Sequence, residues 1–508
     1  MSTVRHHIAF VVLVAAVLVG CTDGGAERGS GSSESSAAPR LAAFHATRGA
    51  NAAVMDDAGR QVRLRGVNVN SLGDYYQADP HLPPVVPVTD ADWADMAKQG
   101  FNVVRLLVSW SSLEPERDVF DDAYVGRVHD AVKAASAHGI YSVIDMHQDA
   151  WGKYIATPPG VTCAPGSEPA IGWDGAPQWA TLTDGADTCR PGSRESSEAV
   201  MTAWDSFYAN RDGIMDELVG AWSKLSTSFR EDPAVAGYDL LNEPNHGHDG
   251  DRAKTALGTF YAKAIDAIRS AESTTGSIHH IAFFETTVFG VPVDPGFTAD
   301  DNIVLAPHNY AESIDDLPID GLFDYFAGLA SQYGTAMWVG EYGWFGDPPA
   351  SAEKLERFAA KEDSLGTAGD AWWQWRQACG DPHSVGEPGG TPDAILIHFR
   401  RNGCPGDHDL GVVPEWQCAS RPYAKAAPGH VTLATADCTN HLTLTAHTDQ
   451  SGQVEIWVPD ASTGKPEVHG DHITDVQIAA VPGGWNVTAQ ADGDYSLAVS
   501  EATGTTSS

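Results

Sequence analysis

The stretch "VAGYDLLNEP" (residues 235–244) decides how the sequence is interpreted, because it joins an apolar run to an abruptly polar end. Its first part reads as a buried β-strand, and the pattern breaks at Asn242-Glu243-Pro244. A loop begins where a strand ends, so a lone glutamate at such a place is usually a solvated loop residue. The break gains meaning only if other strands end in the same way.

Eight segments of this kind occur between about residues 45 and 415. They are short, rich in β-branched or aromatic residues and bounded by turn residues. They are "RLRGVNVN" (63–70), "FNVVRLLVSW" (101–110), "IYSVIDMH" (140–147), "VAGYDLLNEP" (235–244), "HHIAFFET" (279–286), "NIVLAPHNY" (302–310), "AMWVGEYGW" (336–344) and "DAWWQW" (370–375).

Helical patterns separate these strands, and the first begins at Thr89 with Asp92 three residues later, as in a capping box. Continuous apolar strands that alternate with helices indicate a parallel sheet. Eight such units in roughly 370 residues predict an α/β fold, a (β/α)8 TIM barrel over residues 45–420. A doubly wound open sheet is the alternative, and the lack of a G-x-G-x-x-G after the first strand weakens it.

Two segments depart from the alternation. Residues 151–197, which follow the third strand, form a long insertion rich in Gly, Pro and Trp, and a loop of this length is usually functional. Residues 421–500 have no helical period and read as short strands between turns. We therefore expect a C-terminal all-β sandwich domain.

The N-terminus reads as an export signal rather than as part of the fold. A weakly basic start precedes an apolar run, Ile8 to Val19, which is too short to span a bilayer. We expect residues 1–20 to be a signal peptide of the lipoprotein type, with Cys21 lipidated, and residues 21–44 to be a flexible Gly/Ser tether. An ordinary signal cut nearby is the alternative. The mature protein is then exported, and either anchored to the membrane by lipid or secreted.

Six cysteines remain after Cys21. An even number in an exported chain suggests disulfides, and neighbours in the sequence give one of 15 possible pairings. That pairing is Cys163–Cys189, Cys379–Cys404 and Cys418–Cys438.

The net charge of −37 argues against nucleic acid as a partner, since a phosphate backbone needs Lys and Arg for neutralisation. The sequence contains no cofactor motif, and its histidines lack the H-E-x-x-H spacing of a zinc site. We expect no metal, no cofactor and a monomer.

Polar side chains stand at most of the predicted strand ends, and a parallel barrel brings such ends to one mouth. Two glutamates facing each other there, Glu243 and Glu341, suit glycoside hydrolysis, in which one carboxyl attacks and the other donates a proton. Arg105 and Tyr310 are expected to hold Glu341 ionised, and Asn242 is placed to bond a sugar hydroxyl. Glu285, Asp145 and Asp149 are rival carboxylates, and Glu285 is either a substrate contact or a structural group.

Asn-Glu-Pro after strand four and Gly-Glu-Tyr-Gly after strand seven, with Arg105, His147, His308, Tyr310 and Trp373 in order, resemble glycoside hydrolase family 5, a retaining barrel family. "IDMHQDAWGK" (144–153), "GAPQWATL" (175–182) and the C-terminal sandwich resemble its endoglycoceramidase branch. The resemblance implies a glycosphingolipid substrate, cleaved between the oligosaccharide and the ceramide.

The resemblance also implies residue roles. Glu243 would be the acid/base and Glu341 the nucleophile, with the sugar subsites lined by Asp145, His147, Trp179, Asn242, Tyr310 and Trp373. The tryptophans of the insertion, Trp151, Trp173 and Trp179, would form a wall on which sugars stack. Some members of the branch carry a basic residue in the loop after strand one; residues 67–90 contain no Lys or Arg, so the first sugar, glucose or galactose, stays open.

Two other functions stay open beside this one. The first is a family 5 hydrolase that acts on another β-glycoside, such as a β-glucan, a β-mannan or a sterol glucoside. The second is a lipid-tethered surface protein that binds carbohydrate without catalysis.

Overall fold

The computed structural model describes residues 41–77, 81–314, 316–345, 348–383, 398–403, 408–460 and 464–501. The predicted signal peptide, Cys21 and Cys404 lie outside these residues. Within the described ranges, no helix is both long and apolar enough to cross a membrane.

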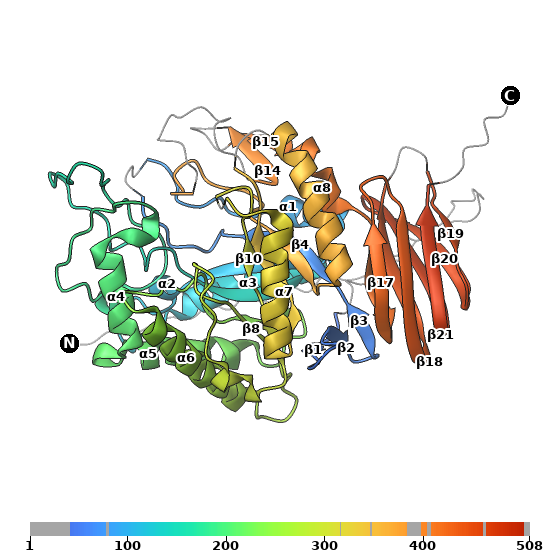
Figure 1. The fold of residues 1–508 in the computed structure, drawn as a ribbon, viewed down its shortest axis with the longest axis horizontal. Helices are drawn as coiled ribbons and strands as arrows, with labels where there is room; N and C mark the ends of the chain where they lie inside the picture. The colour runs from blue at the N-terminus through green and yellow to red at the C-terminus, as the bar shows by residue number, and fades with distance from the viewer. Residues whose placement is uncertain are drawn as a thin grey trace, which may run out of the picture. The chain divides into compact units, whose positions relative to one another are not determined.

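A closed barrel of parallel strands carries the predicted strand ends (Figure 1). Its strands, in chain order, are β4 (Leu64–Val69), β5 (Val103–Ser109), β6 (Tyr141–His147), β7 (Val235–Asp239), β8 (Ile281–Phe284), β9 (Ile303–Leu305) with β10 (His308–Asn309), β11 (Ala336–Met337) with β12 (Val339–Tyr342), and β13 (Gly369–Trp372). β13 pairs with β4 in parallel, which closes the barrel. The predicted (β/α)8 barrel is confirmed, and a doubly wound open sheet is excluded because the first and last strands of such a sheet do not pair with each other.

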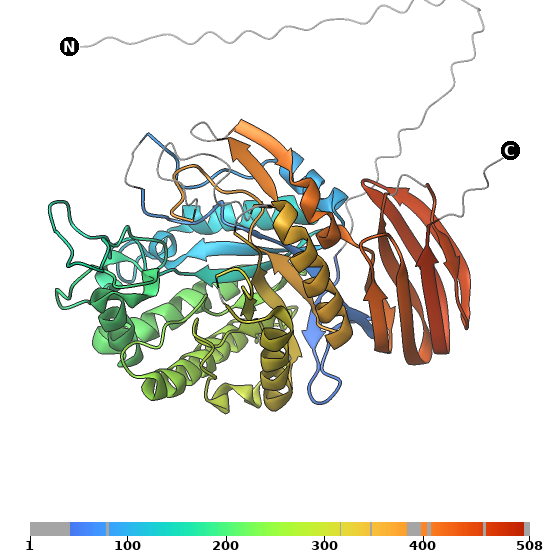
Figure 2. The same cartoon turned by 45° about the horizontal axis from the view of Figure 1, so that its top comes forward.

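Helices lie outside the strands (Figures 1 and 2). They are α1 (Asp90–Lys98), α2 (Trp110–Leu113), α3 (Asp122–Ala137), α4 (Glu198–Tyr208), α5 (Ile214–Phe229), α6 (Gly250–Ala271), α7 (Ile319–Tyr333) and α8 (Pro348–Leu365). The predicted capping box is confirmed at the start of α1, where the side chain of Thr89 accepts from the backbone N–H of Asp92. The Asp92 carboxylate accepts in return from the backbone N–H of Thr89, at 3.0 Å.

The C-terminal region is antiparallel. Its strands are β16 (Tyr423–Pro428), β17 (His430–Ala436), β18 (Leu442–Pro459), β19 (Glu467–His469), β20 (Ile473–Val481) and β21 (Gly484–Ser500). The two long strands, β18 and β21, pair along both of their halves with a break in register between Thr448 and Gly452. Side chains of both halves meet in one apolar cluster, which includes Leu444 and Ile456. A short hairpin, β14 (Arg400–Gly403) with β15 (His408–Val412), stands apart from both sheets.

Three N-terminal strands belong to this C-terminal sheet. They are β1 (Phe44–Ala46), β2 (Val54–Asp56) and β3 (Arg60–Val62), and β3 pairs antiparallel with β16. The sequence analysis placed this segment in the barrel. Three-residue strands carry too little pattern to reveal their partner, and this pairing spans more than 360 residues of sequence, from Val62 to Ala426.

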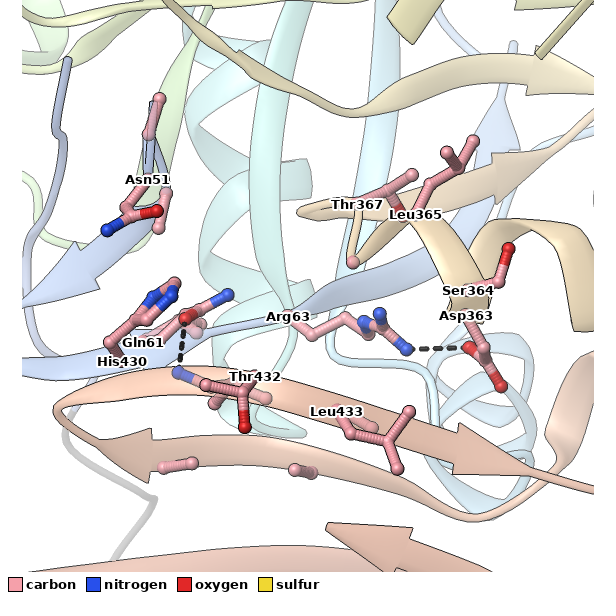
Figure 3. A pocket seen from close by; sticks show the side chains of 18 of the residues that line it. Asn51, Gln61, Arg63, Asp363, Ser364, Leu365, Thr367, His430, Thr432 and Leu433 are labelled. Carbon is pink, nitrogen blue, oxygen red and sulfur yellow. Dashed lines mark hydrogen bonds and ion pairs between the residues drawn. The ribbon is translucent and has the colours of Figure 1, made fainter. Parts of the chain in front are cut away.

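Buried charges join the barrel to the C-terminal sheet. The guanidinium of Arg421 contacts Glu362 at 2.5 Å and Asp363 at 3.0 Å, and Arg63 contacts Asp363 at 2.7 Å. Figure 3 shows the Arg63–Asp363 pair beside a cavity of about 320 Å³, which lies between the N-terminal hairpin, the end of α8 and β17. Because this cavity is at the opposite end of the barrel from Glu243 and Glu341, it takes no part in their site.

Two of the predicted disulfides, Cys163–Cys189 and Cys418–Cys438, are confirmed. Cys379 is disulfide-bonded too. Its predicted partner lies outside the described residues, so that pairing stays a prediction.

Candidate active site

The predicted strand-end residues meet at the carboxyl-terminal mouth of the barrel, and Arg105 on β5 is the centre of the cluster. Its side chain is fully buried. The guanidinium contacts four carboxylates, from different strands: Asp239 at 2.8 Å, Asp145 at 2.9 Å, Glu285 at 3.1 Å and Glu341 at 2.7 Å. One cation thus fixes the orientation of four strand ends.

Glu341 on β12 has a donor on each oxygen. Arg105 donates to Oε1 at 2.7 Å, and the Tyr310 hydroxyl donates to Oε2 at 2.8 Å. Both contacts are those expected from the sequence. Burial nevertheless raises the pKa of Glu341, although His308 and Arg105 oppose this rise.

Glu243 follows β7 and also has a cation on each oxygen. His308 Nδ1 lies 2.9 Å from Oε1, and Arg194 donates to Oε2 at 2.7 Å. Burial raises the pKa of Glu243, but the hydrogen bond to His308 and the charge of Arg194 outweigh it and hold the pKa at about 2. Glu243 is therefore ionised in this arrangement.

This order of pKa values reverses the one expected from the sequence. A proton donor needs a raised pKa and a nucleophile a lowered one, yet Glu243 has the lowered value and Glu341 the raised one. The physical reason is a cation on each oxygen of Glu243: first the hydrogen bond of His308, and then the charge of Arg194, a residue of the insertion that the sequence analysis did not consider.

His147 at the end of β6 is held by carboxylates on both ring nitrogens. Nδ1 lies 2.8 Å from Asp145 and Nε2 lies 3.5 Å from Asp149. These anions raise the pKa of His147 to about 10 despite its burial. The indole of Trp373 stacks on the imidazole, with ring centroids 5.4 Å apart. Asp145 is fully buried, so it orients His147 and Arg105 rather than contacting a ligand.

Asn242 and Glu285 turn inward. The Asn242 amide accepts from Arg105 at 2.9 Å and donates to the carbonyl of Gln148 at 2.9 Å, and the residue is 1% exposed. Glu285 accepts from the backbone N–H of Glu243 at 3.0 Å and is 3% exposed. The structure thus favours the structural alternative for Glu285.

The expected tryptophan wall is wrong for Trp151. Trp151 is 2% exposed and packs against Trp204, so no sugar can stack on it. Trp179 is half-buried, packs edge-on against Trp110 and donates to the carbonyl of Glu114, and its place in a sugar subsite stays a prediction. The sequence shows that a tryptophan is present but not which way its backbone turns.

Trp173 is the tryptophan of the insertion that contacts the cluster. It lies under the Arg194 guanidinium, 4.7 Å from its ring centroid, and meets His383 edge-on. The insertion also supplies Lys153, which pairs at 2.6 Å with Asp74 in the loop after β4. A lysine therefore lies beside that loop, although the loop itself contains no basic residue.

Asp239, Arg194 and His383 are among the residues of the cluster that were not predicted. Asp239 lies within the stretch quoted first, and a charged residue inside an apolar strand is a signal that could have found it. Arg194 and His383 come from long loops and carry no such signal. His383 bridges Asp149 and Asp381, at 2.6 and 2.8 Å, which raises its pKa to about 9.

Two groups of donors have the composition of a metal site: His147, Asp149 and His383, and Glu243, His308 and Glu341. In each group an imidazole nitrogen lies within hydrogen-bond distance of a carboxylate oxygen, at 2.6 Å from His383 to Asp149 and at 2.9 Å from His308 to Glu243. These direct contacts are ion pairs between an imidazole and a carboxylate.

Comparison with known proteins gives one family and several structural relatives. The model of the Cellulase family (glycosyl hydrolase family 5) matches residues 55–378. A crystal structure of an endogalactoceramidase is 41% identical, with a TM-score of 0.82, over 90% of this chain and 99% of that chain. Endo-glycoceramidase II from Rhodococcus sp., in a complex with ganglioside GM3, is 25% identical, with a TM-score of 0.69, over 89% and 99%.

Among curated proteins, endoglycoceramidase I of Rhodococcus hoagii (strain 103S) is 29% identical over 282 residues. The matched segment is 51% of this chain and 51% of that protein. The chain spans about half the length of the curated relatives it matches.

Proposed function

The chain belongs to glycosyl hydrolase family 5, and on this premise we propose that it is a retaining endo-β-glycosidase, which separates the glycan of a glycosphingolipid from its ceramide. The distance between the two glutamates carries the retaining assignment. One oxygen of Glu243 and one of Glu341 lie within 4.8 Å of each other. Retaining enzymes hold their carboxyl groups about 5–5.5 Å apart, whereas inverting enzymes need about 6.5–9.5 Å to admit a water.

The contacts of each glutamate suggest its role. Arg105 and Tyr310 orient Glu341, which we assign as the nucleophile that attacks the anomeric carbon. Glu243 is then the acid that protonates the departing oxygen as the glycosidic bond breaks. In the second half of the reaction Glu243 takes a proton from water, whose oxygen displaces Glu341 from the sugar.

The assignment of ceramide as the aglycone, and of the sugar attached to it, rests on the relatives. The solved structures that cover nearly all of this fold are described as endogalactoceramidase and endo-glycoceramidase II. The higher identity to the first, 41% against 25%, favours galactose as the sugar attached to ceramide.

Thin-layer chromatography of four digests tests this function: a ganglioside, a globoside, galactosylceramide and a soluble cello-oligosaccharide. We expect ceramide and an intact glycan from at least one glycolipid, and no cleavage of the cello-oligosaccharide. Cleavage of the cello-oligosaccharide alone would instead identify a β-glucanase, and binding to glycolipid without any cleavage would identify a carbohydrate-binding protein.

We also propose that the protein acts as an exported monomer, anchored by lipid at Cys21. The support is the sequence alone, in which a short apolar run ends in Leu18-Val19-Gly20-Cys21. Cys21→Ala should move the protein from the membrane fraction to the soluble fraction. Membrane retention of a correctly processed variant would contradict the anchor.

A further inference from the structure

Glu243 cannot donate a proton in the arrangement that the structure shows. His308 lies within reach of three carboxylates, at 2.9 Å from Glu243, 3.2 Å from Glu285 and 3.4 Å from Glu341. This imidazole closes the inner side of Glu243 around Oε1, and its side chain is only 7% exposed. Oε2 is therefore the oxygen that faces the open side, where Arg194 is 25% exposed.

Arg194 occupies the place that the departing oxygen needs. Its guanidinium lies 2.7 Å from Oε2 of Glu243. Arginine has only donors and stays protonated at any working pH, so a guanidinium N–H and a protonated Oε2 cannot face each other at this distance. For Glu243 to protonate a leaving group, Arg194 has to be elsewhere.

The side chain of Arg194 can move, although the backbone beside it is tied down. Neighbouring Glu195 is 4% exposed, accepts from the backbone N–H of Ala150 at 3.1 Å and accepts from the side chain of Asn245 at 3.1 Å. The guanidinium itself has two further anions, Asp149 at 2.5 Å and Glu195 at 3.2 Å, and rests on the face of Trp173. It can therefore leave Glu243 and still be paired.

We propose that the aglycone displaces Arg194 from Glu243, so that occupancy of the leaving-group position decides whether Glu243 is ionised. The inference rests on the proposed function, and it adds a positioning residue that controls the proton of Glu243. With the aglycone bound, Arg194 lies aside and Glu243 holds a proton. Once the protonated aglycone has left, the attacking water takes its place and Glu243 accepts a proton from that water. Arg194 returns to Glu243 after the product has left and this proton has passed to solvent.

The charges around Glu243 support this coupling. The cations that face it are His308 on β10 and Arg194 in the short helix Arg194–Ser196. The anions around it are Asp149, Glu195, Glu285 and Glu341. Withdrawing one of the two cations leaves these four anions opposite a single imidazolium. The pKa of Glu243 then rises from its low value, as an acid requires.

Arg194→Gln and a matched control, Arg190→Gln, test the proposal. Arg190 lies in the same insertion, is 27% exposed and pairs with Glu168 at 2.6 Å, away from Glu243. The substrates are octyl and 2,4-dinitrophenyl β-lactosides, with the matching β-galactosides as a second pair. The octyl group needs an acid to depart and the dinitrophenyl group does not. Any sugar that is cleaved serves, so failure of the ceramide assignment leaves the test intact.

The pH dependence of kcat/KM reports the free enzyme and that of kcat the complex. For the octyl glycoside we expect Arg194→Gln to move the basic limb of kcat/KM upward by about 1 to 3 pH units, the effect of losing an adjacent cation. The basic limb of kcat should stay where it is, because Arg194 has already left in the complex. The pH profile of kcat/KM for the dinitrophenyl glycoside should have no such basic limb. Arg190→Gln should leave the pH profiles of both glycosides unchanged.

Three outcomes would overturn the proposal. If both limbs move together, Arg194 stays on Glu243 in the complex. If neither moves, Arg194 does not control the proton. If Arg194→Gln loses activity on both substrates while Arg194→Lys and Arg190→Gln keep it, Arg194 is a substrate-binding residue that is not displaced.

Discussion

At the scale of single residues, the site is an arrangement of charges in which each carboxylate depends on a neighbour. Arg105 contacts four carboxylates, so none of them has a full positive charge to itself. Burial therefore still raises the pKa of Glu341, whereas Glu243, with His308 on one oxygen and Arg194 on the other, has a pKa of about 2.

The roles of the two glutamates predict different failures. Glu243→Ala should still attack a dinitrophenyl glycoside, then accumulate the glycosyl-enzyme, and azide should rescue turnover with a retained product because an anion needs no general base. Glu341→Ser should be rescued by azide with an inverted product. Each change should lower turnover of a natural substrate by about 10²–10⁴-fold or more.

Product stereochemistry, followed by NMR, distinguishes the two variants. The opposite pattern, with inversion from Glu243→Ala, would show that the roles are exchanged.

The contact between Glu285 and the backbone of Glu243 predicts that a change at Glu285 misplaces Glu243. The φ of Glu243 is +39°, in the left-handed region, and the Glu285 carboxylate accepts its N–H at 3.0 Å. In Glu285→Gln the side-chain amide NH2 replaces one carboxylate oxygen. It then faces either the backbone N–H of Glu243 or the donors of Arg105 and His308, and two donors that face each other form no hydrogen bond. We expect kcat to fall about 10- to 100-fold, as small misplacements of a catalytic group do, with little change in KM.

Glu272→Gln is the control for Glu285→Gln, since Glu272 is as deeply buried and pairs with His280 away from the mouth. Steady-state kinetics should show no change in kcat for Glu272→Gln. An unchanged kcat for Glu285→Gln would mean that Glu243 needs no such support.

At the scale of elements, the insertion after β6 is the part that distinguishes this barrel mouth. It carries Arg194 to Glu243 and Lys153 to the loop after β4. The insertion contains little regular secondary structure, so a disulfide and a few buried contacts keep its conformation. Its Cys163–Cys189 bond closes a loop with a sequence separation of 26.

Replacement of both Cys163 and Cys189 by Ala should lower the free energy of unfolding by about 3 kcal/mol or slightly more, the chain-entropy value for such a loop. Activity should fall as well, because the segment that carries Arg194 loses its tie. Denaturant titration and kinetics measure the two effects.

The matching change at Cys418 and Cys438, whose sequence separation is 20, is the control. It should lower stability by a similar amount and leave activity unchanged. Equal losses of activity in the two double variants would show that the insertion needs no disulfide for its function.

At the scale of the whole molecule, the barrel and the C-terminal sheet depend on each other. β3, immediately before the first barrel strand, pairs with β16, and the buried Arg421 after the barrel contacts Glu362 and Asp363 on α8. Chain segments from both ends of the barrel thus enter the second sheet.

Arg421→Met should cost about 3–5 kcal/mol of unfolding free energy, since it leaves buried carboxylates short of a partner. Lys361→Met is the control, because its pair with the exposed Asp324 lies at the surface and such pairs contribute about 0–1 kcal/mol. Thermal unfolding compares the two. Equal Tm values would show that the junction needs no charge balance.

The sequence by itself determined the barrel and the pair of glutamates to which we assign the catalytic roles. Strands buried on both faces carry a continuous apolar signal, and a polar residue that ends such a run is visible at once, as in Leu241-Asn242-Glu243. The parallel topology then requires all strand ends to share one mouth, so Arg105, His147, His308 and Glu341 could be grouped without coordinates.

Only the tertiary structure decided what lies against that pair. Arg194, Trp173 and His383 come from loops, which carry no periodic pattern, and their positions depend on contacts with residues distant in the sequence. The partners of the three-residue strands β1–β3 are likewise set by pairing across the whole chain. Protonation states follow from these same long-range contacts, because a pKa responds to charges within a few ångströms of space rather than to neighbours in sequence.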